Sequence, residues 1–439
     1  MFMKMNFIKI FWLLFYILIF FLLLHNSFSY LDPDLGWHLQ AGKEIVNIGS
    51  VPYENTYHYT LEGQKWIDHE WLLDAFSFWV YSNWGYIVLS IIFALLVVLT
   101  LALWHNFIHK NYVKNSRSLF FVVLFFLWGV IAISPHIGVR MQEITLLNLA
   151  LLLIIIFYYN KNKDYRILLF LPFLFYFWAC VHAGFLIGLF LAVLFPVVKI
   201  GERFLAKFTA WDFIDYGKIL SGKKIFSFFV FVVISFIATL LTPYGGELYS
   251  FLGGYANTFY MTHIQEWLGQ YYLPLNYWQL VYLSTGAAIL VLWIAQSFHK
   301  GGKFKIDLWQ LCLFLLFLFL AFKSRRHFPL FFLVSLPIII YFSVNFFSIK
   351  EKSLNFKGRW LDFLIKAFLI MCFISSILLI VININFVNNP FQNYCKSYPC
   401  EAVDFLKNNS QYRNYKIFNN YGWGGYLSWR YPQKKLFID

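Results

Sequence analysis

The chain has 439 residues and is 60% hydrophobic and 23% aromatic, while charged residues make up only 13% of it. This apolar share is too high for a soluble globular domain and indicates an integral membrane protein. The formal net charge of +14 does not indicate nucleic-acid binding, because the Lys and Arg residues lie in the loops between apolar runs, mostly in alternate loops. We expect no nucleic-acid partner.

Apolar runs separated by polar breaks predict the transmembrane helices. Several charge-free runs exceed about 17 residues, which is long enough to cross roughly 30 Å of hydrocarbon. No clean small-x-small cleavage site follows the first run, so we treat it as a retained span. An all-α polytopic membrane protein with about eleven spans is expected, at 7–28, 86–107, 118–134, 143–159, 166–181, 184–199, 225–242, 280–298, 306–322, 328–347 and 361–386.

The first long polar segment, residues 30–85, holds eight of the 21 acidic residues. It begins with "LDPDLGWHL", where Asp32 before Pro33 is a suitable helix N-cap and Asp34 favours the same helix dipole. A second helix is predicted in "WIDHEWLLDAFSFWV", with Asp68 as its N-cap. These acids are therefore either helix caps or members of a site, and the sequence leaves both interpretations open.

Loop charges predict the orientation. If the N-terminus is cytoplasmic, every inner loop is basic, whereas residues 30–85 contain only Lys43 and Lys65 as Lys or Arg, and residues 243–279 contain none. This is the positive-inside pattern. We expect a protein of the cytoplasmic (inner) membrane with a cytoplasmic N-terminus and with its C-terminal segment outside.

One outer connection, "KSRRH", departs from that pattern with Lys323, Arg325 and Arg326. The structural interpretation is that these side chains extend toward lipid headgroups. The sharper interpretation is that they hold an anion at the outer face of the membrane.

The final segment, residues 388–439, is less apolar and predicts the start of a small α/β domain that follows a transmembrane domain at 1–387. "PCEAVDFLKNN" favours a helix, "YKIFN" and "KKLFID" favour strands, and "YGWGGYLSW" favours a Gly-rich turn or helix start. The segment stops within a predicted strand, so we expect it to be truncated. Cys395 and Cys400 can form a short disulfide in an oxidising compartment.

The chemistry of these residues suggests group transfer from a lipid phosphate. A carboxylate at a partly dry membrane surface is a stronger base than usual, and two acids spaced as Asp32 and Asp34 can share a divalent cation such as Mg²⁺ or Mn²⁺. Cations can neutralise a phosphate leaving group. The catalytic candidates are Asp32, Asp34, Asp68 and Glu70, and the phosphate-binding candidates are Arg325, Arg326, Lys323 and Arg140.

Further polar and aromatic residues could bind substrate. The candidates are His38, His69, His182, Glu266 and Trp267. Aromatic rings beside acids suit sugars, although Trp and Tyr are also the usual residues of the membrane interface. No nucleotide-binding signature and no Cys/His zinc cluster is present in the sequence.

The order of these features resembles the GT-C superfamily of polytopic glycosyltransferases, which use polyprenyl-phosphate-linked sugars, and looks most like a bacterial branch of it. The likeness runs along nearly the whole chain, through "LDPDLGWHL", "WIDHEWL", "RMQE", "WACVHAGF", "LLTPYGGELY", "IQEWLG", "KSRRHFPLF", "FNNYGWGGYLSW" and "LFID". It implies that Asp32 or Asp34 acts as base or metal ligand and that Arg325 or Arg326 contacts the lipid phosphate. The expected acceptor is a glycan, lipid or protein at the outer face.

Three other functions compete with this one. A transporter or flippase of a lipid-linked saccharide would use the same residues to hold a headgroup, but transporters place polar groups near mid-membrane. A non-catalytic membrane scaffold would bind a partner through the tail. A hydrolase with two carboxylates is conceivable, but it would not explain the outer cations.

Overall fold

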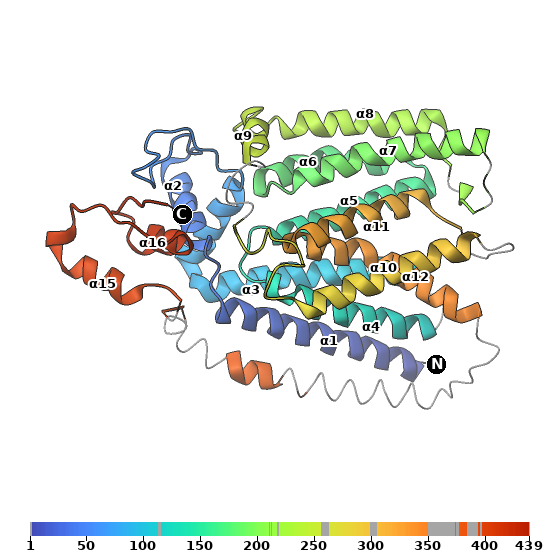
Figure 1. Ribbon diagram of the computed structural model, residues 1–439, viewed down its shortest axis with the longest axis horizontal. Helices are drawn as coiled ribbons and strands as arrows, with labels where there is room; N and C mark the ends of the chain where they lie inside the picture. The colour runs from blue at the N-terminus through green and yellow to red at the C-terminus, as the bar shows by residue number, and fades with distance from the viewer. Residues whose placement is uncertain are drawn as a thin grey trace.

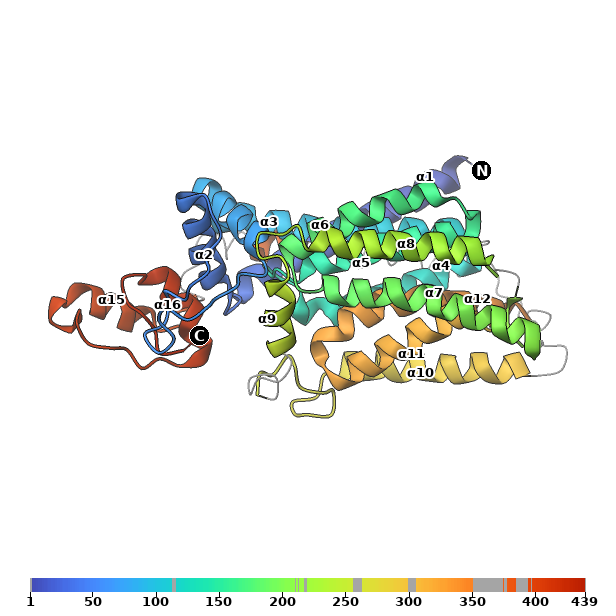
Figure 2. The same ribbon diagram turned by 90° about the horizontal axis from the view of Figure 1, so that it is seen from above.

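Long helices lie side by side in the computed structural model, and short elements gather at one end of them (Figure 1). The structure describes residues 2–112, 116–209, 211, 213–216, 219–255, 263–298, 305–349, 374, 377–383, 394–395 and 397–438. The end that carries α2 (Leu35–Ile48) and α16 (Gly424–Arg430) lies opposite the N-terminus. We call it the α2 end. Figure 2 shows α9 (Glu247–Tyr255) lying across the long helices at this end.

The described part of the chain is helical, and its β pairing is limited to isolated bridges. The 3₁₀ helices include Ser134–His136, Tyr165–Leu169, Arg325–His327 and Tyr421–Trp423. The other α-helices are α1 (Phe2–Ser29), α3 (Trp71–Tyr112), α4 (Ser116–Ile133), α5 (Glu143–Asn162), α6 (Phe170–Val181), α7 (Phe185–Phe208), α8 (Gly222–Thr239), α10 (Tyr277–Phe298), α11 (Leu308–Lys323), α12 (Phe328–Ile349) and α15 (Cys400–Asn408).

Among the described residues, seven helices are long and apolar enough to cross a membrane, and three shorter apolar helices accompany them. Ten of the predicted spans each coincide with one of these helices. The eleventh, 361–386, lies largely outside the described residues. A multi-pass, all-helical architecture is therefore confirmed, while the number of eleven spans stays a prediction.

The long helices bury one side and expose the other. α12 packs against α3, α4, α5, α10 and α11, and Phe331 and Phe332 are among its fully buried side chains. On the outside of the bundle, large apolar side chains such as Phe190 and Val197 of α7 are more than half exposed. Continuous exposed apolar surface of this kind is expected where helices face lipid.

A glycine separates the span in α3 from the part that reaches the α2 end. Gly85 has φ 75° and ψ −177°, a backbone conformation that residues other than glycine rarely adopt. The part of α3 before Gly85 packs against α2, and Asp68 accepts the backbone N–H of Glu70 at 3.0 Å just before α3 begins. The predicted helix pair in residues 30–85 is therefore present, with Asp68 bonded to the backbone next to the helix start.

The C-terminal segment docks on α2 through two glycines. A Cβ on Gly36 would lie 1.8 Å from the carbonyl oxygen of Gly425, and a Cβ on Gly425 would lie 2.1 Å from that of Pro33. Further along, Leu436 forms a parallel bridge with His58. The backbones of α2 and α16 can approach this closely only because neither residue has a side chain.

The rest of the tail matches the prediction in part. The helix predicted at "PCEAVDFLKNN" is α15, and Cys395 and Cys400 are bonded to each other. Residues 416–420 form no strand pairing, and 435–438 pair only through the Leu436 bridge. The pairing stays short because its partner is the irregular loop around His58. The predicted α/β domain is not confirmed within the described residues and stays a prediction.

Replacing Gly425 by Ala should loosen the docking of the tail on α2. The added methyl group would overlap the carbonyl of Pro33, and overpacking of this kind costs about 1–3 kcal/mol. We expect a lower melting temperature in detergent and faster tryptic cleavage at Arg413 and Lys416. Gly253→Ala is the control, since a Cβ there meets nothing within 4 Å. Equal behaviour of the two variants would contradict the close-contact explanation.

Candidate functional site

A cluster of charged side chains joins three loops at the α2 end. Arg140 Nε lies 2.7 Å from Asp32 Oδ2, and Arg140 Nη1 pairs with Glu266 Oε1. The Arg140 side chain is 9% exposed. Although burial favours the neutral acid, Arg140 and Arg326 together hold the pKa of Glu266 below its ordinary value. Three of the predicted site residues are thus brought into direct contact.

Asp34, and not the predicted Asp32, is the residue that immediately precedes α2, and it is exposed to water. Its backbone N–H donates to Asp32 Oδ1 at 2.9 Å, and its side chain makes no capping bond to α2. Desolvation by the protein and the negative charge of Asp32 raise the pKa of Asp34 to about 6. Asp34 is therefore an accessible carboxylate with the basicity that proton abstraction needs.

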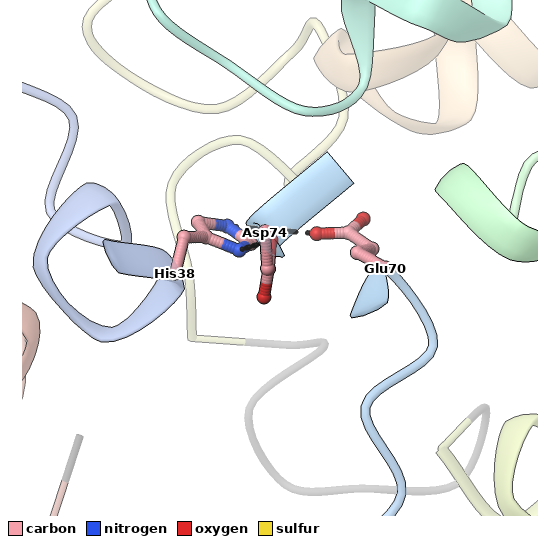
Figure 3. A group of neighbouring side chains, drawn as sticks. All are labelled: His38, Glu70 and Asp74. Atoms are coloured by element: carbon pink, nitrogen blue, oxygen red, sulfur yellow. Dashed lines mark hydrogen bonds and ion pairs between the residues drawn. The ribbon is translucent and has the colours of Figure 1, made fainter. Parts of the chain in front are cut away.

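A second group of polar side chains is buried where α2 meets the start of α3. His38 Nδ1 lies 2.8 Å from Asp74 Oδ1, and His38 Nε2 lies 3.5 Å from Glu70 Oε2 (Figure 3). His38, Glu70, Asp74 and Asp68 are each no more than 6% exposed. Burial and the charge of Asp74 raise the pKa of Glu70 to about 8, although the opposing charge of His38 lowers it. Burial and Asp74 also raise that of Asp68.

His182 approaches the same carboxylate from the α6–α7 turn. Its Nδ1 accepts the backbone N–H of Gly184 at 2.8 Å and lies 2.8 Å from Thr145 Oγ1, so its proton is on Nε2. That nitrogen is 3.4 Å from Glu70 Oε1. Burial and the charge of Arg326 lower the pKa of His182, so the ring is neutral. His69 Nε2 lies 3.6 Å from the same Glu70 oxygen.

The cations of the α11–α12 connection take up different positions. The guanidinium of Arg326 lies 4.8 Å from the centre of the Trp267 ring, at the distance of a cation–π contact. It is near enough to favour the ionised forms of Asp34 and Glu70. Arg325 is buried and donates to the carbonyl of Tyr272, while Lys323 is exposed on the last turn of α11. Arg326 is thus the cation best placed to meet a ligand.

Two residues that position side chains of the site, Asp74 and Thr145, were not predicted from the sequence. Asp74 follows Glu70 by four residues, a spacing that places both on one face of a helix, but it lies inside an apolar run. Thr145 donates to His182 and accepts Trp178 Nε1 at 3.0 Å. The Glu70–Asp74 spacing was a usable signal for the first; no sequence signal links Thr145 to His182.

Two sets of side chains could hold a metal ion. Asp32 and Asp34 are the predicted pair, but both oxygens of Asp32 already have partners, Arg140 and the Asp34 N–H. His38, Glu70 and Asp74 form the other set, with one ligand atom from each within 4.8 Å of the others. Within the described part of the chain, no Lys or Arg forms an ion pair with the ligand atoms of the second set.

Comparison with known proteins adds no family to this geometry. No family model matches the chain, and no curated protein matches it. The resemblance to the GT-C superfamily is therefore a hypothesis that depends on the motifs and their placement.

Replacing Arg140 by Gln should destabilise the α2 end. It leaves the carboxylates of Asp32 and Glu266 without their cation, and breaking a buried pair in this way costs about 3–5 kcal/mol. We expect a clear loss of unfolding free energy in detergent, partly restored by adding Asp32→Asn.

Lys65→Gln is the matched control. Lys65 pairs with Glu247 at 2.7 Å, but the two side chains are 56% and 51% exposed, and exposed pairs contribute about 0–1 kcal/mol. An equal loss of unfolding free energy in both variants would show that the Arg140 pairs contribute no more than an exposed ion pair.

Proposed function

We propose that this protein is a membrane glycosyltransferase similar to the GT-C superfamily, which moves a sugar from a polyprenyl-phosphate donor to an acceptor at the outer face of the cytoplasmic membrane. One observation carries the proposal. At the end of an apolar helical bundle, an accessible carboxylate of raised pKa, Asp34, lies within electrostatic reach of a cation, Arg326, that stacks on Trp267. A base and a phosphate-binding cation beside a membrane suit transfer from a lipid phosphate.

The reaction assigns these two residues distinct roles. Asp34 accepts the proton of the acceptor hydroxyl as its oxygen bonds to the anomeric carbon. The bond from that carbon to the phosphate oxygen breaks, and polyprenyl phosphate leaves with the electron pair. Arg326 stabilises the negative charge of the leaving phosphate, and Trp267 offers an aromatic face to the sugar. Arg140 is a positioning residue, because it holds Asp32 and Glu266 on either side.

The remaining predictions from the sequence are compatible with this reaction. Eleven spans, a transmembrane domain at 1–387 and an outer α/β segment at 388–439 are part of the proposal. The α2 end would face the outside and the N-terminus the cytoplasm, as the loop charges predict. A divalent cation is part of the proposal as a cofactor. His38, Glu70 and Asp74 are favoured over Asp32 and Asp34 as its site, because both oxygens of Asp32 already have partners.

A transporter or flippase of a lipid-linked saccharide is the second candidate. The spans do contain buried polar groups, including the ion pair of Lys199 with Glu202 in α7, which a translocation path could use. The denser collection of ionisable side chains lies at the α2 end, which favours surface chemistry. A scaffold role would make the same residues structural.

Transfer should be measured with the purified protein in lipid, using a panel of polyprenyl-phosphate sugars with and without divalent cation. Asp34→Asn removes the base and should lower polyprenyl-phosphate release by about 10²–10⁴-fold. Arg326→Gln should cost about 10²–10³-fold. The control is Glu54→Gln, an exposed acid of the same loop. Saturable donor binding without turnover, unchanged in Asp34→Asn, would favour transport or a scaffold.

The pH profile should identify the base. Asp34 acts in its ionised form, and its pKa is about 6, so transfer is expected to fall as the pH drops through 6. The ordinary pKa of an aspartate would place this limb near 4. The limb should be absent from the residual activity of Asp34→Asn. A limb that persists in that variant would assign the base to another group.

A further inference from the structure

His38, Glu70 and Asp74 form a buried cluster at the junction of α2 and α3 to which the proposed reaction gives no chemical step. One ligand atom from each lies within 4.8 Å of the others. The three side chains are between 0% and 7% exposed. A cluster that contains an imidazole and two carboxylates, and that is closed to solvent, has the composition of a metal site.

The separations within the cluster differ from those of a simple hydrogen-bond network. His38 Nε2 and Glu70 Oε2 are 3.5 Å apart, beyond the 2.7–3.2 Å usual for an N–H···O bond. Two ligand atoms bonded to one cation at about 2.1 Å lie roughly 3.0–3.4 Å apart. The other ring nitrogen, Nδ1, is 2.8 Å from Asp74 Oδ1. A carboxylate on the far side of the ring is the arrangement that orients a metal-binding histidine.

The charges of the cluster also call for a cation. Asp68, Glu70 and Asp74 place three carboxyl groups close together, and in the described part of the chain the Oδ2 atoms of Asp68 and Asp74 are buried without a hydrogen-bond partner. One imidazolium could balance only one of them, and buried anions without partners are costly. The alternative to a metal ion is protons on these carboxyl groups.

We propose that His38 and Glu70 bind a divalent transition-metal ion, Zn²⁺ or Mn²⁺, and that Asp74 orients the His38 ring toward it. An imidazole nitrogen among carboxylates suits these ions, whereas Mg²⁺ and Ca²⁺ prefer oxygen ligands alone. Nε2 of His38 and Glu70 face the ion, and Asp74 holds the ring from Nδ1. The inference does not depend on sugar transfer, because it concerns the ligands and not a reaction.

Such an ion would join the two helices that form the α2 end. His38 lies on α2, whereas Glu70 and Asp74 lie at the start of α3. The helices already touch at Gly42, where a Cβ would lie 2.0 Å from the carbonyl oxygen of Asp74. A ligand that binds only the folded state stabilises it, so the melting temperature should rise with the concentration of Zn²⁺ or Mn²⁺.

Metal content tests the proposal directly. The full chain, purified in detergent and stripped with a chelator, is equilibrated with Zn²⁺ or Mn²⁺ alone and measured by inductively coupled plasma mass spectrometry. We expect one ion per chain, loss of the ion in His38→Gln and Glu70→Gln, and about 10–100-fold weaker binding in Asp74→Asn. Asp32→Asn is the control and should keep its ion. Folded wild type without a stoichiometric ion, or loss of the ion in Asp32→Asn, overturns the proposal.

A measurement on the wild type alone guards against variants that fail to fold. Pulsed electron paramagnetic resonance of the Mn²⁺-loaded protein reports nitrogen bonded to the ion. A ¹⁴N coupling typical of imidazole is expected. Its absence from a folded, loaded sample would place the ion on oxygen ligands elsewhere and overturn the assignment to His38.

Discussion

The guanidinium of Arg140 lies between two carboxylates from distant parts of the chain, and the arrangement of the α2 end depends on it. Asp32 precedes it by 108 residues and Glu266 follows it by 126. The backbone N–H of Arg326 donates to the carbonyl of Glu266 at 2.9 Å, so the position of Arg326 follows from that of Glu266. One buried cation therefore determines how the first turn of α2 faces the Trp267–Arg326 pair.

The two acidic groups of the α2 end differ in how their charge is balanced. Asp32 and Glu266 share a permanent cation, because an arginine does not lose its proton at ordinary pH. The group around His38 has more carboxyl groups than nearby cations, so protons or a metal ion must complete it. The Asp32–Arg140–Glu266 group is therefore suited to fixing the geometry of the site. The group around His38 is suited to binding a proton or an ion.

The sequence predicted what hydropathy and local spacing determine. Apolar runs located the helices, and Asp68 lies next to the start of α3 as predicted. The start of α2 was placed two residues too early, because Asp34 and not Asp32 precedes its first residue, Leu35. Which acids meet which cations could not be predicted, since it depends on how the helices pack. Asp74 illustrates the limit: its spacing from Glu70 suggests a shared helix face, but only the packing of α2 on α3 shows that it is buried against His38.

The site is held from the membrane side as well as from the loops. Trp178 donates to Thr145, Thr145 donates to His182, and the remaining N–H of His182 faces Glu70. This chain begins on α5 and α6, whose buried side chains are closely packed, and it fixes both the tautomer of His182 and its direction. Asp34, in contrast, is on an exposed turn with no side-chain capping bond to its helix. A rigid support beneath Glu70 and an accessible carboxylate at Asp34 are what a site needs when it must hold one group still and let another meet a substrate.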